Sequence, residues 1–518
     1  MRIFRVLILL TIASILILTE GCNKPRKVRD PNTLVYLMYN DVQDWDPASA
    51  FSLEILPLSN LYEPLLWYDS SGDKPIFVPA LATSYSSSDD GIIWTFHIRE
   101  DVRFHDGRLC NARAVKQCIQ RTMSIREGPG FIWDAVEEIK VVDDLIIEFH
   151  LKYPAPIDLI VSSQYGAWIY SPGLGNLDRD FIRKGYAAGT GPYKLGGWAP
   201  NQSIILEKNE DYWKFNKESY QRIDLRIVSE AATRIQMIKG DEADICSLIP
   251  IEALSSFENH PDVELKIFPS WVNHLLIFNV KKAPTDDLRI RKAIAASIDY
   301  NSIIKNIYSG MASQPTGLVP GSLPGIQPSD NLYKFDLEKA EALLKEVGIN
   351  EDVTLNLSYV ASSNEYWKTC LMLQSNCRKL GLNVKLNSGL WSEIWSKARR
   401  FDSAPNMIEM AWWPTYATPS DWFLGMFYTQ DKPVFNLSYY SDSHIDSLIQ
   451  VSRELEAFDR DKASRIYGKI QSILIDNCVA IPVADLNAWI VARKDLTGFR
   501  KNPAYATINF HHLRKEPS

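Results

Sequence analysis

The sequence has little cysteine, little excess positive charge and no second long apolar run. Its 518 residues include 7 cysteines, and no two of them form a Cys-x-x-Cys pair, so a redox or zinc motif of that kind is excluded. After the N-terminus no apolar run reaches the length of about 18 residues that a membrane span needs. The formal net charge is −7, so the chain lacks the basic balance of a nucleic-acid binder, and no nucleic-acid partner is expected.

Motifs of catalysis and metal binding are absent as well. The 8 histidines form neither a His-Glu-x-x-His motif nor a Cys/His cluster with zinc spacing, so no metal ligands and no cofactor are predicted. The sequence has no Gly-x-Ser-x-Gly motif for a serine nucleophile and no phosphate-binding P-loop. We therefore predict no catalytic residues and expect that the chain is not an enzyme. A secreted hydrolase whose residues follow no familiar motif stays open as an alternative.

The N-terminus reads as a targeting segment. Met1–Arg5 is basic, and Val6–Leu18 is an apolar core of about 13 residues, which fits a signal peptide and is short for a membrane span. Gly21-Cys22 follows and resembles a bacterial lipoprotein signal. We predict a signal peptide at 1–21, lipid attachment at Cys22 and a solvated tether at 22–29. A plain secretory signal and a retained anchor are the alternatives, and each places the body outside the cytoplasmic membrane.

What is present is the composition and patterning of a globular α/β protein. Hydrophobic residues make up 46% of the chain and charged residues 23%, and the length suffices for several domains. Apolar Leu34–Tyr39 predicts a strand buried on both faces, alternating Trp94–Arg99 predicts a half-buried strand, and Asn111 is a helix N-cap candidate. Disulfide pairing stays open in an oxidising compartment, but most of the six cysteines beyond Cys22 are expected to be small buried hydrophobic residues: 110, 118, 246, 370, 377 and 478.

The second half alternates helices with strands. Three stretches have helical periodicity and each ends before a glycine: Leu288–Ser309, Asp336–Val347 and Trp367–Leu380. The last two lead directly into the strand candidates Val353–Leu357 and Leu382–Leu386. Two helix–glycine–strand units in succession predict part of a mostly parallel sheet.

Several ordered motifs give the chain a family resemblance. They are Leu61-Tyr62-Glu63-Pro64-Leu65, Val78-Pro79-Ala80-Leu81-Ala82, Gly91 to Arg99, Val102 to Gly107, Gly189-Thr190-Gly191-Pro192-Tyr193, Leu206 to Asn209, Asp211-Tyr212-Trp213, and Phe278-Asn279 with Leu288 to Ile294. In this order and spacing the sequence resembles the bacterial extracellular solute-binding proteins of the oligopeptide, dipeptide and nickel type, which serve ABC importers. The resemblance covers about residues 34–500.

The resemblance implies an α/β, two-lobed periplasmic-binding-protein fold of type II, with ligand between the lobes. Mapped onto this chain, the first lobe comprises 30–47, 172–278 and 485–518, and the second lobe comprises 279–484. An extra α/β domain inserted in the first lobe is expected at 48–171. The hinge is expected near Phe278-Asn279-Val280 and Ile481-Pro482-Val483, where two strands cross between the lobes.

The resemblance also points to a ligand-binding loop at Trp412 to Phe423. In the family this loop commonly carries acidic residues, and the first of them commonly pairs with the α-ammonium of a bound peptide. Here those positions fall on Thr415 and Thr418, and only Asp421 could replace them from nearby. The ligand-binding residues that we predict are Trp45, Trp271, Asn273, Trp413, Thr415, Tyr416, Asp421 and Trp422. Core packing is the alternative role of the aromatic members.

The function implied is that of an extracytoplasmic receptor. It would capture peptides between two closing lobes and deliver them to the permease subunits of an ABC importer. The N-terminal lipid would attach the receptor to the membrane. The expected location is the periplasm or the extracytoplasmic face of the membrane. An oligosaccharide or another polar solute is the alternative ligand, and a sensory module is an alternative role.

Overall fold

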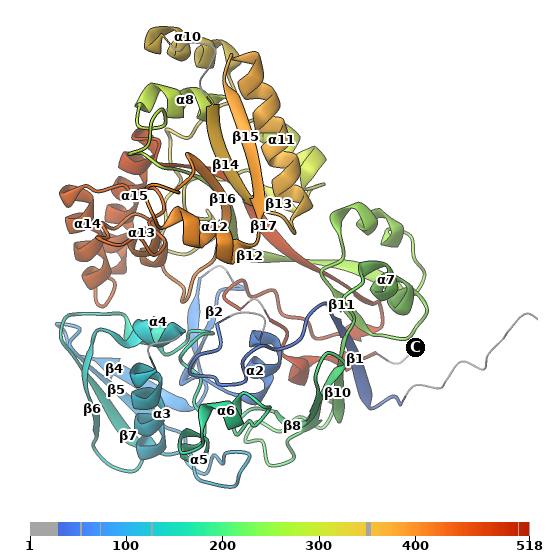
Figure 1. Cartoon of the computed structure of the whole chain (residues 1–518). Coiled ribbons are helices and arrows are strands. Elements are labelled where there is room, and N and C mark those ends of the chain that lie inside the picture. Colours follow the sequence, from blue (N-terminus) through green and yellow to red (C-terminus); the bar gives the residue numbers. More distant parts are fainter. Residues whose placement is uncertain are drawn as a thin grey trace, which may run out of the picture.

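The structure is a computed structural model that describes residues 30–51, 54–72, 74–125, 128–348, 354–505 and 507–516. The predicted signal peptide, Cys22 and tether lie outside the described residues. Among the helices of the described part, none is long and apolar enough to cross a membrane. Figure 1 shows an upper and a lower body joined by two long strands, β12 (Val263–Phe278) and β17 (Ala480–Arg493).

One mixed sheet runs through both bodies. Its other strands are β1 (Thr33–Met38), β8 (Tyr193–Ala199), β9 (Ser203–Lys208), β10 (Arg222–Ile227), β11 (Ile245–Ser247), β13 (Ala312–Ser313), β14 (Thr354–Val360), β15 (Asn383–Gly389) and β16 (Met407–Trp412). The order is β15-β14-β16-β12-β17-β11-β1-β10-β9-β8, with β13 paired to β17 beside this path. β12 pairs with β17 along most of its length and with β16 only from Asn273 onward. The two long strands therefore carry the chain from one body into the other.

The upper body surrounds its end of the sheet with helices. They are α8 (Leu288–Ala296), α9 (Tyr300–Ser302), a π-helical turn (Ile303–Ile307), α10 (Leu337–Val347), α11 (Asn364–Lys379), α12 (Trp391–Ala398), α13 (Ser420–Met426), α14 (Ser443–Leu455) and α15 (Arg460–Asp476). β14 is parallel to both β15 and β16, which confirms the predicted parallel segment. Gly348 and Gly381 follow their helices at φ +71° and +79°, a backbone conformation that costs other residues more.

The single helix predicted over Leu288–Ser309 is wrong. α8 ends at Ala296, and the carboxylate of Asp299 accepts a hydrogen bond from the Ser302 backbone N–H, 3.0 Å away, to start α9. An N-cap carboxylate in the middle of an apolar-periodic stretch competes with helix continuation, which explains the break. The predicted apolar face is confirmed, since Ile290, Ile294 and Ile298 are all buried.

The lower body contains the remaining elements. They are α2 (Ile55–Leu61), the hairpin β2 (Leu66–Asp69) and β3 (Ile76–Pro79), β4 (Ala82–Ser87), β5 (Ile93–Ile98), α3 (Ala112–Ser124), a 3-10 turn (Pro129–Trp133), β6 (Val136–Val141), β7 (Ile146–Leu151), α4 (Ile157–Ile160), α5 (Pro172–Gly175), α6 (Arg179–Ile182), α7 (Ala231–Lys239), a second 3-10 turn (Ile251–Phe257), and, near the C-terminus, β18 (Leu496–Thr497), a third 3-10 turn (Phe510–His512) and β19 (Arg514–Lys515).

Within the lower body a separate antiparallel sheet, β4-β5-β7-β6, lies at the left of Figure 1 with α3 against it. Its strands all fall inside the segment 48–171 for which we predict an inserted domain. The predicted strand at β5 and the N-cap at Asn111 are confirmed, because the Asn111 side chain accepts from the Ala114 backbone N–H. The boundaries of the lobes and of the inserted domain stay predictions.

The cores of both bodies are apolar, and the cysteines belong to them. The six cysteines of the described residues are free and buried, as the sequence predicts. The glycine pair of Gly189-Thr190-Gly191 has a steric cause. A Cβ at Gly189 would lie 1.9 Å from the carbonyl oxygen of Leu61, and one at Gly191 would lie 2.7 Å from that of Asn60. The chain passes so close to the end of α2 that only glycine fits.

Candidate functional site

A row of residues crosses the sheet where the long strands pass between the bodies. Asn273 of β12 lies directly opposite Trp412 of β16 on one side and Asp485 of β17 on the other, and Asp485 lies opposite Ser313 of β13. Residues opposite one another on adjacent strands project to the same face, with Cα atoms about 4.5–5.5 Å apart. We call these four residues the floor row.

The face that carries the floor row is directed at the lower body. Trp271 lies two residues before Asn273, within a stretch of β12 where the register with β17 shifts, and like Asn273 it is buried. Its ring centroid is 6.2 Å from that of Tyr68 in β2. The floor row thus lies at the base of the contact between the two bodies.

Asn273 and Trp271 are both buried, and both make hydrogen bonds to other segments of the upper body. The Asn273 side-chain amide donates to the carbonyl of Leu318 at 2.8 Å, and its oxygen accepts from the Trp422 indole N–H at 3.2 Å. The Trp271 indole N–H donates to the carbonyl of Ser322 at 3.2 Å. The structure therefore brings three predicted site residues together, and each has its polar group engaged within the protein.

The loop between β16 and α13 contains most of the other predicted residues. Trp413 is 44% exposed, whereas Thr415 and Tyr416 are buried and Trp422 is fully buried. The carbonyl of Thr415 accepts a hydrogen bond from the Ser163 hydroxyl at 2.7 Å. Burial raises the pKa of Tyr165, and the neighbouring Trp413 side chain opposes that shift. In this conformation Trp413 is the one aromatic side chain of the predicted loop set with a large accessible area.

Asp421 is enclosed by its own loop. The Trp412 indole N–H donates to one carboxylate oxygen at 3.3 Å, and Thr415 provides further hydrogen bonds. Burial raises the pKa of Asp421 to about 6, although these hydrogen bonds oppose the shift. Within the described residues Asp421 makes no ion pair. Its carboxylate oxygens accept hydrogen bonds from neutral groups of the loop and so help to fix the loop's shape.

Trp45 lies in the core of the lower body. It is fully buried, and its ring meets that of Trp198 edge-on at 5.6 Å between centroids. A solute could reach this ring only after the surrounding chain moved. The prediction that Trp45 contacts ligand stays a prediction, and in this conformation the residue serves packing.

The contact between the two bodies contains an ion pair that the sequence analysis missed. One guanidinium nitrogen of Arg460, at the start of α15, donates to both carboxylate oxygens of Asp158 in α4, at 2.6 and 2.7 Å. Nearby, Glu456 accepts hydrogen bonds from the hydroxyls of Thr418 and Ser420. Burial raises the pKa of Glu456 to about 7 and also raises that of Asp158, against the influence of Arg460.

The same contact includes a cation–π contact and a glycine at a point of close approach. The guanidinium of Arg453 lies 5.3 Å from the ring centroid of Tyr153, and a Cβ at Gly91 would lie 2.8 Å from that of Ala457. We call this region, where segment 77–163 meets α14, α15 and the 412–423 loop, the junction. It is tightly packed and its charges are matched by the protein itself.

Asp485 of the floor row is the second residue that the sequence analysis missed. One carboxylate oxygen accepts from the Gly321 backbone N–H at 3.2 Å, and the other is buried without a hydrogen-bond partner in the described residues. Burial raises the pKa of Asp485 to about 6. The sequence does contain a signal for Asp485. It is the one acidic residue inside the apolar run of β17, three residues after Pro482.

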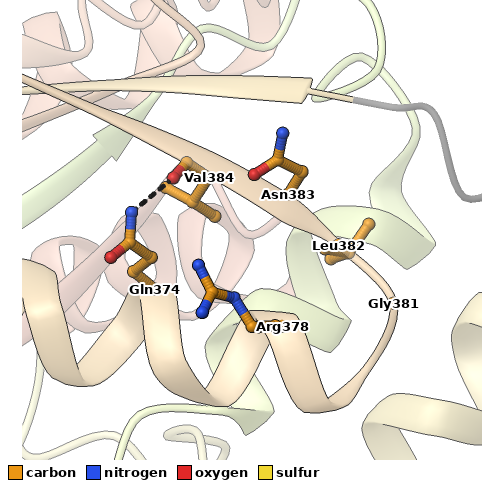
Figure 2. Close-up of a pocket in the computed structure, with 6 residues that line it drawn as sticks. All are labelled: Gln374, Arg378, Gly381, Leu382, Asn383 and Val384. Carbon is orange, nitrogen blue, oxygen red and sulfur yellow. Dashed lines mark hydrogen bonds between the residues drawn. The ribbon is translucent and has the colours of Figure 1, made fainter.

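A surface hollow lies elsewhere, on the upper body. It has a volume of about 290 Å³ and lies between α11 and β15, with Gln374, Arg378 and Val384 among its lining residues. Figure 2 shows the Gln374 side-chain amide donating to the carbonyl of Val384, at 2.7 Å. β15 is at the far edge of the sheet, separated from β12 by β14 and β16, so this hollow is remote from the floor row. Among the described residues no group of three or more metal-ligating side chains is found.

Comparisons with known proteins fit this architecture. The sequence is 28% identical over 487 residues to the probable D,D-dipeptide-binding periplasmic protein DdpA of Escherichia coli strain K12, covering 92% of this chain and 91% of that one. The structure is similar to that of the ABC transporter-associated periplasmic binding protein DppA from Helicobacter pylori in complex with the peptide STSA, with a TM-score of 0.79, 23% identity and coverage of 94% and 98%. It is similar also to NikA from Brucella suis in complex with Fe(III)-EDTA, with a TM-score of 0.83, 23% identity and coverage of 94% and 100%.

The family assignment rests on the sequence itself. Residues 77–433, well over half of the chain, match the family described as bacterial extracellular solute-binding proteins, family 5 Middle. The match spans the antiparallel sheet of the lower body, β12, and the upper body as far as the loop after α13. The two-lobed α/β fold predicted from the resemblance is confirmed by the similar structures, and this chain belongs to the bacterial extracellular solute-binding proteins of family 5.

Proposed function

We propose that this solute-binding protein is the peptide receptor of an ABC importer. The supporting observation is the family match over residues 77–433 together with two bodies that share the long strands β12 and β17. DdpA is named for D,D-dipeptides, and the similar DppA structure holds a tetrapeptide. The receptor captures a peptide between the lobes and hands it to the permease subunits.

The mechanism is binding with a shift between open and closed populations. A solute stabilises the closed form only through contacts that are better in that form than in the open one. Such hinge closure is a known motion of periplasmic binders. For scale, a dissociation constant of 1 μM corresponds to about −8 kcal/mol. In this proposal Trp413 supplies an aromatic face, Thr415 and Tyr416 shape the loop, and Trp45, Trp271, Asn273, Asp421 and Trp422 support the site from the core.

A second solute class has one observation in its favour. Thr415 and Thr418 occupy the loop positions where the family commonly has acidic residues. A peptide ammonium without a carboxylate there loses a charge-assisted hydrogen bond of about 1.5–3 kcal/mol. A neutral oligosaccharide would not need that carboxylate.

Thermal unfolding with added solutes tests the proposal. The protein is first unfolded and refolded to remove co-purified solute, and is then heated with di-, tri- and tetrapeptides, with oligosaccharides and with Ni²⁺. We expect peptides to raise the melting temperature in a concentration-dependent manner, because a ligand of the native state stabilises it. A rise with oligosaccharides alone would replace the peptide assignment, and turnover of any solute would contradict the receptor role.

We further propose that the receptor is held at the membrane by a lipid on Cys22, after removal of residues 1–21. Support comes from the short apolar core followed by Gly21-Cys22. Labelling of bacterial cultures with an alkyne fatty acid should mark the protein, and Cys22→Ser should abolish the mark. A mark that survives this substitution would contradict the anchor.

A further inference from the structure

We propose that Asp485 is the anionic contact of the solute site, where its partner-free carboxylate oxygen binds a protonated amine of the captured solute. This inference rests on the proposed binding of a solute between the lobes, and it adds the chemical group that the solute must carry. For a peptide, that group is the terminal ammonium or a lysine side chain.

The position of Asp485 favours this role. It belongs to the floor row, one strand from Asn273, and therefore lies on the same face of the sheet as Asn273. β12 and β17 are the strands that pass between the bodies, so a solute held on this row touches the part of the fold about which the bodies would turn.

Its partners distinguish Asp485 from the other acidic side chains of the region. Asp158 is paired with Arg460, and Glu456 is held by two hydroxyls. Asp421 accepts from Trp412 and Thr415. Asp485 accepts one backbone N–H, makes no ion pair in the described residues, and has one buried oxygen without a partner. Because an unsatisfied buried carboxylate oxygen is costly, an ammonium donor that enters the site gains a strong contact.

The surroundings fix the direction of that contact. The Gly321 N–H holds one oxygen, which leaves the second oxygen as the acceptor for a ligand. The loop that carries Gly321 is itself attached to the sheet. Trp271 donates a hydrogen bond to its residue 322, and Asn273 donates one to its residue 318. Trp271 and Asn273 are buried, and a charge-assisted hydrogen bond beside such water-excluded groups is stronger than in water.

This arrangement also accounts for Thr415 and Thr418, the two loop positions where a carboxylate is absent. The carbonyl of Thr415 accepts from Ser163 across the junction, and Thr418 donates its hydroxyl to Glu456 within the upper body, so both residues are already engaged by the protein. A charge for the solute must then come from another element, and β17 supplies it.

The test uses pairs of probes that differ only in one amine. Peptides of two to four residues without lysine are offered with a free and with an acetylated N-terminus, and the glucosamine disaccharide is offered beside its N-acetylated form. Affinities are measured calorimetrically for the wild-type protein, for Asp485→Asn and for Glu54→Gln. Glu54 is the matched control, because it is a buried carboxylate of the lower body that also has one partner-free oxygen. Melting temperatures without probe verify that each variant is folded.

We expect the wild-type protein to bind the free-amine peptides about 10- to 100-fold more tightly than the acetylated ones. Asp485→Asn should lose this preference, and Glu54→Gln should keep it. The inference would be overturned if Asp485→Asn kept the same ratio of free-amine to acetylated affinity as the wild-type protein. It would also be overturned if only Glu54→Gln lost that ratio.

The two proposals fail in different ways. If no peptide binds but the free-amine disaccharide binds through Asp485, the peptide assignment is wrong and the amine contact stands. If the protein prefers acetylated probes, or binds neither member of either pair, the amine contact is wrong.

Discussion

The junction and the floor row solve the problem of buried charge in opposite ways. At the junction, Asp158 meets Arg460 and Glu456 meets two hydroxyls, so the protein satisfies its own carboxylates. On the floor row, Asp485 has one backbone donor and one empty acceptor. The Asp158–Arg460 pair fastens the two bodies together, and Glu456 is held inside the upper body, whereas in our proposal the unsatisfied oxygen of Asp485 receives a donor from the solute. The difference teaches that proximity to the site does not by itself make a buried carboxylate a ligand contact.

Removal of the junction cation should have the largest effect. Arg460→Met leaves Asp158, whose side chain is 6% exposed, as a buried charge without its partner. We expect the free energy of unfolding to fall by about 3 kcal/mol at pH 7.5, measured with urea. The double variant Asp158→Asn/Arg460→Met should recover part of this loss because no charge is left buried. A double variant no more stable than the single one would contradict the self-satisfied junction.

Glu456 should make the stability of the junction depend on pH. Its pKa is raised to about 7 in the folded state, so the folded state favours the protonated form and loses stability as pH rises through 7. Glu456→Gln lacks this proton. The free energy of unfolding of the variant minus that of the wild-type protein should therefore rise by about 2 kcal/mol from pH 5 to pH 8, measured with urea. A difference that stays constant over this range would show that Glu456 does not titrate there.

The predicted aromatic residues should separate into support and contact. Trp422→Phe removes a buried donor and leaves the Asn273 oxygen unpaired, so we expect a loss of about 1.5 kcal/mol in the free energy of unfolding. Trp413→Phe is the matched exposed substitution and should change stability by less than about 0.5 kcal/mol. Equal losses in the two variants would contradict this division.

The floor row should respond to pH through solute affinity. Burial raises the pKa of Asp485 to about 6, and only its ionised form pairs with an ammonium. At pH 5 about one tenth of the side chain is ionised, so the affinity for a free-amine peptide should be about tenfold weaker than at pH 8. Asp421, whose pKa is also raised to about 6, is the neighbouring acid that could contribute. Persistence of the full pH dependence in Asp485→Asn would assign it to Asp421.

Much of the fold could be predicted because its signals are local. The glycine stops at 348 and 381, the N-cap at Asn111 and the alternation in β5 each act within a few residues, and each was confirmed. The break between α8 and α9 was missed because apolar periodicity continued through it while a single side chain, Asp299, capped a new helix. Local pattern and local capping conflicted, and capping prevailed.

The candidate site could be predicted only in part, because it is made by long-range pairing. The motif loop was recognisable, and its missing carboxylates were visible in Thr415 and Thr418. Asp485 was not recognisable as a neighbour of Asn273, since 212 positions separate them in the sequence and the pairing of β12 with β17 brings them together. Likewise, Asp158 and Arg460 meet only once the lower and upper bodies are in contact.

The most direct test of the central claim is a crystal structure of the protein with a bound free-amine peptide. Our account predicts the peptide over the floor row, with its ammonium nitrogen within about 3 Å of the Asp485 oxygen that has no partner in the protein. An ammonium placed instead on Asp421 or Glu54, or a solute bound away from β12 and β17, would contradict it.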